Sequence, residues 1–174
     1  MNRINLLVQD YFVSTRTPEL TWFFQALTSF FDFSILFFIT FSIILLIIYR
    51  LKGLYYSTFF LLNVFITMFI VFVLKIIFNT ERPANALIDA FGASFPSYHA
   101  TISTVFFLTI IHVFKENLRG FNSKIFHFIA FLLILLVSIS RVYLGVHWFS
   151  DVFFGILLGT LIHHISINIY RKDK

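Results

Sequence analysis

Long hydrophobic runs separated by short polar stretches dominate the chain from residue 33 onward. A run nearly free of charge over about 20 residues is typical of a helix that crosses a lipid bilayer. We therefore predict five spanning helices, built on residues 33–49, 54–74, 97–114, 125–139 and 148–170. The fourth of these runs is short, but it can be extended through Tyr143.

Residues 1–32 are mixed in character, because charged side chains recur through them. Thr17, Pro18 and Glu19 form a helix-start signal: a capping hydroxyl, a proline in the first turn and an acid near the positive end of the helix dipole. We predict an N-terminal helical segment that lies in the membrane interface, anchored by Trp22. The alternative is that these residues form the first turns of a longer spanning helix. These residues do not show the pattern expected of a signal peptide.

Composition supports a membrane protein. The 174 residues are 59% hydrophobic and only 12% charged, about half the charged fraction of a soluble domain. The expected fold is therefore all-α: an integral membrane bundle of residues 33–174 with the interfacial segment 1–32 attached, forming a single domain. Cysteine is absent, which excludes disulfides, thiolate nucleophiles and cysteine-based metal sites. No charge run suggests nucleic-acid binding, and the sequence does not indicate an oligomeric state.

The distribution of basic residues predicts the orientation. One set of turns and the C-terminus carry Arg50, Lys52, Lys115, Arg119, Lys124, Arg171, Lys172 and Lys174. The opposite side carries Arg3, Arg16, Lys75, Arg82 and Arg141. The positive-inside rule places the first set and the C-terminus in the cytoplasm. Basic residues at outer span ends are disfavoured by orientation, so an anionic ligand is the simplest reason for three of them to be there.

Three stretches at the predicted outer ends carry candidate chemistry, and they suit phosphoryl transfer. Cationic side chains and one hydroxyl can hold phosphate oxygens, while one imidazole attacks phosphorus and another protonates the leaving oxygen. An aspartate four positions after a histidine can fix its tautomer. The residues are Lys75 and Arg82, then Ser97 and His99, then Arg141, His147 and Asp151.

Two plainer interpretations of these residues stay open. In the first, Arg141 lies on the surface, His147 is a satisfied histidine and Asp151 only caps a helix. In the second, His99, His147 and Asp151 bind a metal, although three neighbouring cations would repel a divalent ion.

The motifs Lys-x6-Arg-Pro, Pro-Ser-x-His and Ser-Arg-x5-His-x3-Asp, in this order, resemble the signature of the type-2 phosphatidic acid phosphatase superfamily. That superfamily includes bacterial membrane lipid phosphatases and the vanadium haloperoxidases. The resemblance implies that His147 is a nucleophile forming a phosphohistidine, that Asp151 orients it and that His99 is the general acid. It also implies that no metal or other cofactor is needed, and that phosphate is bound by Lys75, Arg82, Ser97 and Arg141.

The chain departs from the family pattern in two places. Tyr98 stands where many members have glycine, which leaves its role open. Membrane members often have six spans, whereas five are predicted here.

The resulting hypothesis is a lipid phosphate phosphatase at the outer face of the cytoplasmic membrane. The motif residues recognise the phosphate group and not the lipid that carries it. The candidate substrates are therefore phosphatidylglycerophosphate, undecaprenyl pyrophosphate, phosphatidic acid and lipid A phosphates. The alternatives are a lipid phosphotransferase and a non-enzymatic anion-binding membrane protein.

Other residues receive structural interpretations. His112, His127, His163 and His164 are expected to be packing or interface residues, far from the outer face. Tyr98, Tyr143 and Trp148 either line the substrate entrance or form an aromatic belt at the membrane surface, and we favour the belt.

Overall fold

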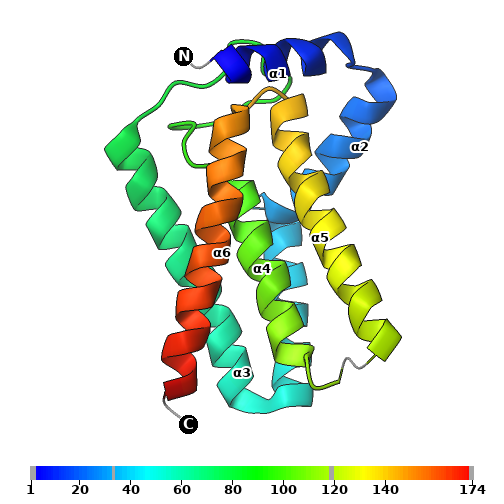
Figure 1. The fold of residues 1–174 in the computed structure, drawn as a ribbon, viewed down its shortest axis with the longest axis vertical. Coiled ribbons are helices and arrows are strands. Elements are labelled where there is room, and N and C mark those ends of the chain that lie inside the picture. The colour runs from blue at the N-terminus through cyan, green and yellow to red at the C-terminus, as the bar shows by residue number, and fades with distance from the viewer. Residues whose placement is uncertain (1–2, 33, 118–119, 173–174) are drawn as a thin grey trace.

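The computed structural model describes residues 3–32, 34–117 and 120–172. All regular structure in these ranges is helical, which confirms the predicted all-α class. The long helices run side by side, and α1 lies across one end of the bundle (Figure 1). The elements are α1 (Arg3–Ser14), α2 (Pro18–Thr28), the short 3-10 helix η1 (Ser29–Phe31), α3 (Ile35–Phe78), α4 (Tyr98–Phe114), α5 (Gly120–Tyr143) and α6 (Phe149–Lys172).

Helix α3 consists of two arms that meet at a sharp turn. Gly53 has φ 84° and ψ −179°, a conformation open to glycine and costly for other residues. The chain reverses there, so the arms lie next to one another in the bundle (Figure 1). They correspond to the runs predicted at 33–49 and 54–74, except that Phe33 lies outside the described residues.

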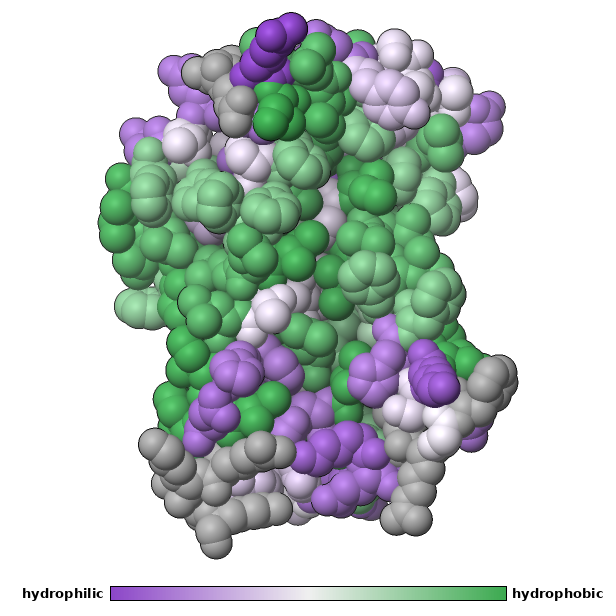
Figure 2. All heavy atoms as spheres, in the orientation of Figure 1, coloured by the Kyte–Doolittle hydropathy of each residue, from purple (hydrophilic) through white to green (hydrophobic). Residues whose placement is uncertain are grey.

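The described helices have the surface expected of membrane spans. Three of them are long and apolar enough to cross a bilayer: Ile35–Phe78, Asn122–Tyr143 and Phe149–Tyr170. Helix α4 is apolar but shorter. Figure 2 shows hydrophobic side chains over the middle of one face and hydrophilic ones toward both ends.

The basic residues used to predict orientation separate along the bundle. The α3 turn, which carries Arg50 and Lys52, lies at the same end as the C-terminus and the end of α4 (Figure 1). Lys75 and Arg141 lie near the other end, in the last turns of α3 and α5. Arg119 and Lys174 lie outside the described residues, as do the side chains of Arg171 and Lys172.

Helix α4 occupies the centre, packed against α3, α5 and α6 (Figure 1). Its contact with α6 is close, because a Cβ at Gly159 would lie only 2.7 Å from the carbonyl oxygen of Thr101. The buried hydroxyls of Thr101 and Thr104 donate to carbonyls one turn earlier, at 2.8 and 2.7 Å. The hydroxyl groups on this face of α4 therefore have their hydrogen bonds within the helix, so the face can pack inside the bundle.

The N-terminal helices rest on the end of the bundle that carries the candidate residues. The Thr17 hydroxyl caps α2, as predicted, by accepting from the Leu20 N–H at 3.3 Å. The Thr17 N–H donates to the Tyr143 hydroxyl at 2.9 Å. Tyr143 is only 2% exposed, so its assignment to an aromatic belt is wrong. It is instead a core residue that connects α5 to the start of α2.

Candidate active site

A polar cavity of about 360 Å³ lies at the end of the bundle where α4 and α6 begin. It forms where the last turns of α3 and α5, the loop 79–97 and the turn 144–148 meet. Three separate stretches of the sequence therefore contribute side chains to this one cavity. Five of the seven predicted site residues line it: Lys75, Arg82, His99, Arg141 and His147.

The other two predicted residues are buried beside this cavity. Asp151 is 3% exposed and, with Arg82, lines a neighbouring cavity of about 710 Å³. Ser97 is fully buried at the N-cap of α4. Its backbone N–H donates to the carbonyl of Asp151 at 3.1 Å. This bond holds the starts of α4 and α6 together.

A serine joins the predicted histidine–aspartate pair. His147 Nδ1 lies 3.6 Å from Asp151 Oδ2, longer than a hydrogen bond. Ser94 Oγ is 3.5 Å from the same Nδ1 and donates a short hydrogen bond to Asp151 Oδ2. Asp151 Oδ2 also accepts from the Trp148 N–H at 3.0 Å. Asp151 therefore caps the start of α6 and also anchors the group next to the imidazole.

The opposite ring nitrogen of His147 faces a cation. Arg82 Nη1 is 3.4 Å from His147 Nε2. An N–H aimed at Nε2 and acceptors near Nδ1 favour the tautomer with its proton on Nδ1. The lone pair of Nε2 then faces the cavity.

Arg82 and Lys75 are also bound to the backbone. Lys75 Nζ donates to the carbonyls of Ala93 and Ser94 at 2.5 and 3.3 Å. The carbonyls that accept from Arg82 belong to Phe91, Gly92, Ala93 and Val146, at 2.6–3.2 Å. Both cations therefore hold the loop around residues 91–94 over the cavity.

An acid that the sequence analysis did not single out pairs with His99. Asp32, at the end of η1, places Oδ1 2.8 Å from His99 Nε2 and also lines the cavity. Burial opposes ionisation of Asp32, but the His99 hydrogen bond and the nearby charges of His99 and Arg141 outweigh it and lower the pKa of this carboxyl. In the sequence, the one indication of a role for Asp32 is that it is an ionisable residue beside a predicted span.

Among the buried polar side-chain atoms of the described residues that have no hydrogen-bond partner, two belong to predicted phosphate-binding residues. They are Ser97 Oγ and Arg141 Nε. Another donor of Arg141, Nη1, is fixed by the Thr28 hydroxyl at 2.7 Å. Leaving a buried donor unpaired costs about 1–3 kcal/mol. Such atoms are expected where a ligand with oxygen acceptors completes the bonding.

The electrostatics of the cavity favour a neutral His147. Burial lowers the pKa of His147 well below its ordinary value of 6.5, and the positive charges of Arg141, Arg82 and Lys75 lower it further. An unprotonated imidazole surrounded by cations suits an attack on an anionic group, because its lone pair stays available.

The turn that carries His147 depends on a glycine. Gly145 has φ 73°, and a Cβ there would lie 2.6 Å from both Arg16 Nη2 and the Asn85 carbonyl oxygen. Arg16 donates to the carbonyls of Asn85 and Tyr143 at 2.9–3.1 Å. The N-terminal segment thus fixes the turn 144–148 in place.

The described residues contain no group of three His, Cys, Asp or Glu side chains arranged to hold a metal ion. His99 pairs with Asp32, whereas His147 is close to Ser94 and Asp151. The remaining histidines do not line the cavity. Among them, His163 is buried next to the Thr109 hydroxyl at 3.2 Å, in agreement with its predicted packing role.

Comparison with known proteins gives matches in sequence and structure. A family model described as the PAP2 superfamily matches residues 56–174. Phosphatidylglycerophosphatase B of Bacillus subtilis (strain 168) is 37% identical over 105 residues, which cover 59% of this chain and 52% of that protein. The chain thus matches about half the length of this curated relative.

Two solved structures share the fold. A transmembrane PAP2-type phosphatidylglycerolphosphate phosphatase from Bacillus subtilis has a TM-score of 0.81 at 26% identity, covering 98% of this chain and 86% of its own. Aquifex aeolicus LpxE has a TM-score of 0.78 at 25% identity, covering 96% of each chain. With its long apolar helices, the protein is a multi-pass membrane protein. Because the family model matches more than half of the chain and includes all three motifs, the chain belongs to the PAP2 superfamily.

Proposed function

We propose that this protein is a membrane phosphatase that releases phosphate from a membrane lipid through a phosphohistidine intermediate. The supporting observation is the composition of one cavity: two histidines, three cations and, beside them, a buried hydroxyl without a partner. The names of the relatives, which include a phosphatidylglycerophosphatase, agree with it.

In the first step, His147 Nε2 attacks phosphorus and the bond from phosphorus to the lipid oxygen breaks. His99 donates a proton to that oxygen, which leaves as an alcohol. Asp32 is expected to position His99 and, as a carboxylate, to favour the protonated form that a general acid requires. Lys75, Arg82, Arg141 and Ser97 stabilise the charge on the equatorial oxygens.

In the second step, water attacks phosphorus and gives its proton to His99, while the phosphorus–nitrogen bond breaks. Inorganic phosphate and the original His147 are regenerated. Asp151 and Ser94 keep the proton on His147 Nδ1, so the same nitrogen is available in each cycle. The Arg82 N–H near Nε2 must turn toward the phosphate oxygens before attack.

We propose that the reaction needs no metal ion, because three cationic side chains already face the space where phosphate charge would develop. A divalent cation in the same space would be repelled by them.

The proposed setting is the cytoplasmic membrane, crossed five times as one domain, with residues 1–32 in the interface. The cavity would face outward and the C-terminus would be cytoplasmic, as the basic residues of the α3 turn indicate. Phosphatidylglycerophosphate is the first substrate to test, followed by undecaprenyl pyrophosphate, phosphatidic acid and lipid A phosphates.

The test is inorganic phosphate release from each of these lipids by the purified protein in detergent with a chelator. His147→Ala and His99→Ala serve as blanks. We expect release from at least one lipid and inhibition by vanadate, which resembles the phosphoryl transition state. Full activity in His147→Ala, or a requirement for added metal, would contradict the proposal. Mass spectrometry of the products distinguishes hydrolysis from transfer to a second lipid.

A further inference from the structure

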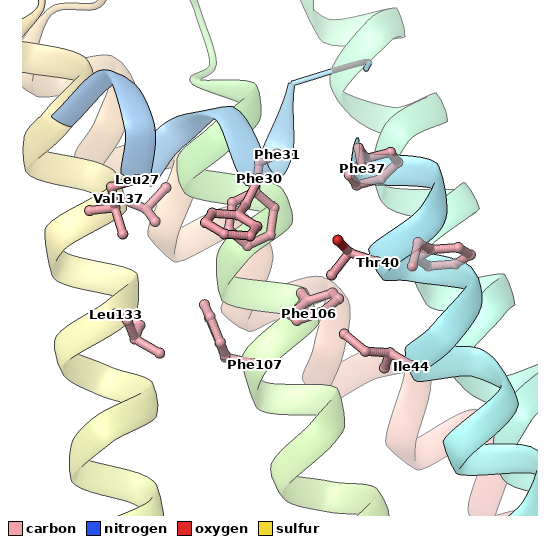
Figure 3. Close-up of a pocket in the computed structure, with 11 residues that line it drawn as sticks. Leu27, Phe30, Phe31, Phe37, Thr40, Ile44, Phe106, Phe107, Leu133 and Val137 are labelled. Carbon is pink, nitrogen blue, oxygen red and sulfur yellow. The ribbon is translucent and has the colours of Figure 1, made fainter. Parts of the chain in front are cut away.

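A second cavity, of about 240 Å³, lies deeper in the bundle than the candidate active site. Five elements of the fold contribute to its wall, and their side chains point into a common space (Figure 3). Among them are Leu27 from α2, Phe31 from η1, Phe37 and Ile44 from α3, Phe106 from α4 and Leu133 from α5.

The side chains that line this cavity leave no hydrogen-bonding group for a ligand to satisfy. Thr40 is the one polar residue among those that line it, and its hydroxyl already donates to the Leu36 carbonyl at 2.8 Å. Hydrocarbon cavities of this kind stay free of water. An occupant should therefore be apolar. Pockets for drug-sized ligands measure about 300–1,000 Å³, so the smaller volume suits a slender alkyl chain better than a bulky ring system.

The cavity adjoins the candidate active site on two elements. Phe31 lines the apolar cavity, and the next residue, Asp32, lines the polar one and contacts His99. On α4, His99 and Phe106 are seven positions apart, which corresponds to two turns or about 10 Å along the helix. A molecule with phosphate beside His99 and a tail directed along α4 would reach Phe106.

One rim of the cavity is accessible from outside the bundle. Phe30 lines the cavity and is 48% exposed. Ile39 and Ile43 of α3, next in sequence to the lining residues Thr40 and Ile44, are also exposed. In a membrane protein these side chains face lipid, so a hydrocarbon chain can enter without crossing water.

We propose that this cavity is an acyl-chain site, which binds one tail of the lipid whose phosphate lies in the active site. This inference rests on the proposed function for the identity of the headgroup. It predicts that the protein measures the length of the tail in addition to recognising the phosphate.

The first test fills the cavity. Leu133→Trp adds bulk inside it, while Leu132→Trp adds the same bulk on the exposed neighbouring position. We expect Leu133→Trp to lower kcat/KM for a dioleoyl lipid phosphate by about tenfold, which is the effect of about 1.4 kcal/mol. Turnover of the dioctanoyl lipid with the same headgroup should change less than about twofold. Leu132→Trp should leave both unchanged. An equal loss for both lipids in Leu133→Trp would overturn the acyl-chain site.

The second test leaves the cavity unaltered. A lipid phosphate with a photoreactive group at the end of its tail is bound to His147→Ala in detergent and irradiated. We expect labels on Phe106, Leu133 or their immediate neighbours, at a higher yield than with the matching diacylglycerol, which lacks phosphate. Labels confined to Met68 and Phe72, which line the polar cavity, would overturn the inference, as would equal yields for both probes.

The two proposals fail in different ways. If the unmodified protein releases phosphate but shows neither the chain-length effect nor the label, only the acyl-chain site is wrong. If it releases phosphate from no lipid, the proposed function is wrong, and the photolabelling still reports whether the cavity binds a tail.

Discussion

The carboxylate of Asp32 lies 2.8 Å from the imidazole of His99, Oδ1 to Nε2, across 67 positions of sequence. It connects the end of the N-terminal segment to the first turn of the central helix α4. In the proposed reaction, His99 donates the proton that the leaving oxygen receives, and Asp32 positions His99 for this transfer.

Asp32→Asn should therefore slow hydrolysis of a lipid phosphate by about tenfold to a hundredfold, part of the range attributed to general acid catalysis. The same variant should form the phosphoenzyme from p-nitrophenyl phosphate at nearly the normal rate, because that leaving group departs without a proton. Asp10→Asn, an exposed change on α1, is the control. Equal losses on both substrates would mean that Asp32 acts only through structure.

Ser94→Ala removes the hydroxyl between Asp151 and His147. Without it, Nδ1 has only a carboxylate oxygen at 3.6 Å to hold its proton, so the imidazole should lose its fixed orientation. We expect kcat to fall by about tenfold or more, as for loss of an orienting partner, while KM changes little. Trapping the phosphoenzyme by rapid quench should show slower formation. An unchanged rate of formation would exclude a role for Ser94 in positioning.

The pH dependence of kcat/KM follows from the charge on His147. Its pKa lies well below 6.5, and protonation removes the attacking lone pair. Activity should therefore persist as the pH falls through 6.5 and decline only at a clearly lower value. Arg82→Gln removes one of the neighbouring positive charges, so the acidic limb of its residual activity should move up toward 6.5. An acidic limb at 6.5 in the unmodified protein would contradict this environment.

Vanadate should stabilise the protein through the unpartnered atoms Ser97 Oγ and Arg141 Nε. At a hundredfold excess over its dissociation constant, a ligand adds about 2.7 kcal/mol to the stability of the folded state. We expect a higher unfolding temperature in detergent with vanadate and a much smaller rise in Arg141→Gln. Sulfate-free buffer with matched ionic strength is the control. An equal rise in both proteins would place the anion elsewhere.

Gly145→Ala should destabilise the fold more than Gly120→Ala. Both positions have positive φ, 73° and 58°, which costs a residue with a side chain about 1–2 kcal/mol. Only at Gly145 would the added Cβ also meet other atoms, Arg16 Nη2 and the Asn85 carbonyl oxygen at 2.6 Å. Thermal unfolding in detergent measures the difference. Equal shifts would show that Arg16 moves aside without cost.

Hydropathy alone predicted the helices well. Runs without charge cannot be placed in water or in loops at low cost, so their ends mark the ends of the arms of α3 and of α4, α5 and α6 within a few residues. The three motifs also identified five residues that line the polar cavity, because cations at the ends of apolar spans have few other reasons to be there.

The contacts that the sequence did not reveal are tertiary. Asp32 and Ser94 reach their partners across 67 and 57 positions, and neither residue type in a loop identifies its partner. Local spacing did indicate one pair. His147 and Asp151 are four residues apart, and Nδ1 lies 3.6 Å from Oδ2, although α6 begins only at Phe149.

Asn5 on α1 completes the first turn of α6. Its carbonyl oxygen accepts from the Ser150 N–H at 3.0 Å, and its amide donates to the Ser150 hydroxyl at 2.9 Å. The residue next to Ser150 is Asp151, so a segment that precedes the family match by about fifty residues helps to hold Asp151 beside His147. Shortened forms designed from the family boundaries would lose this external cap, and the N-terminal helix should be kept when the protein is engineered or trimmed for crystallisation.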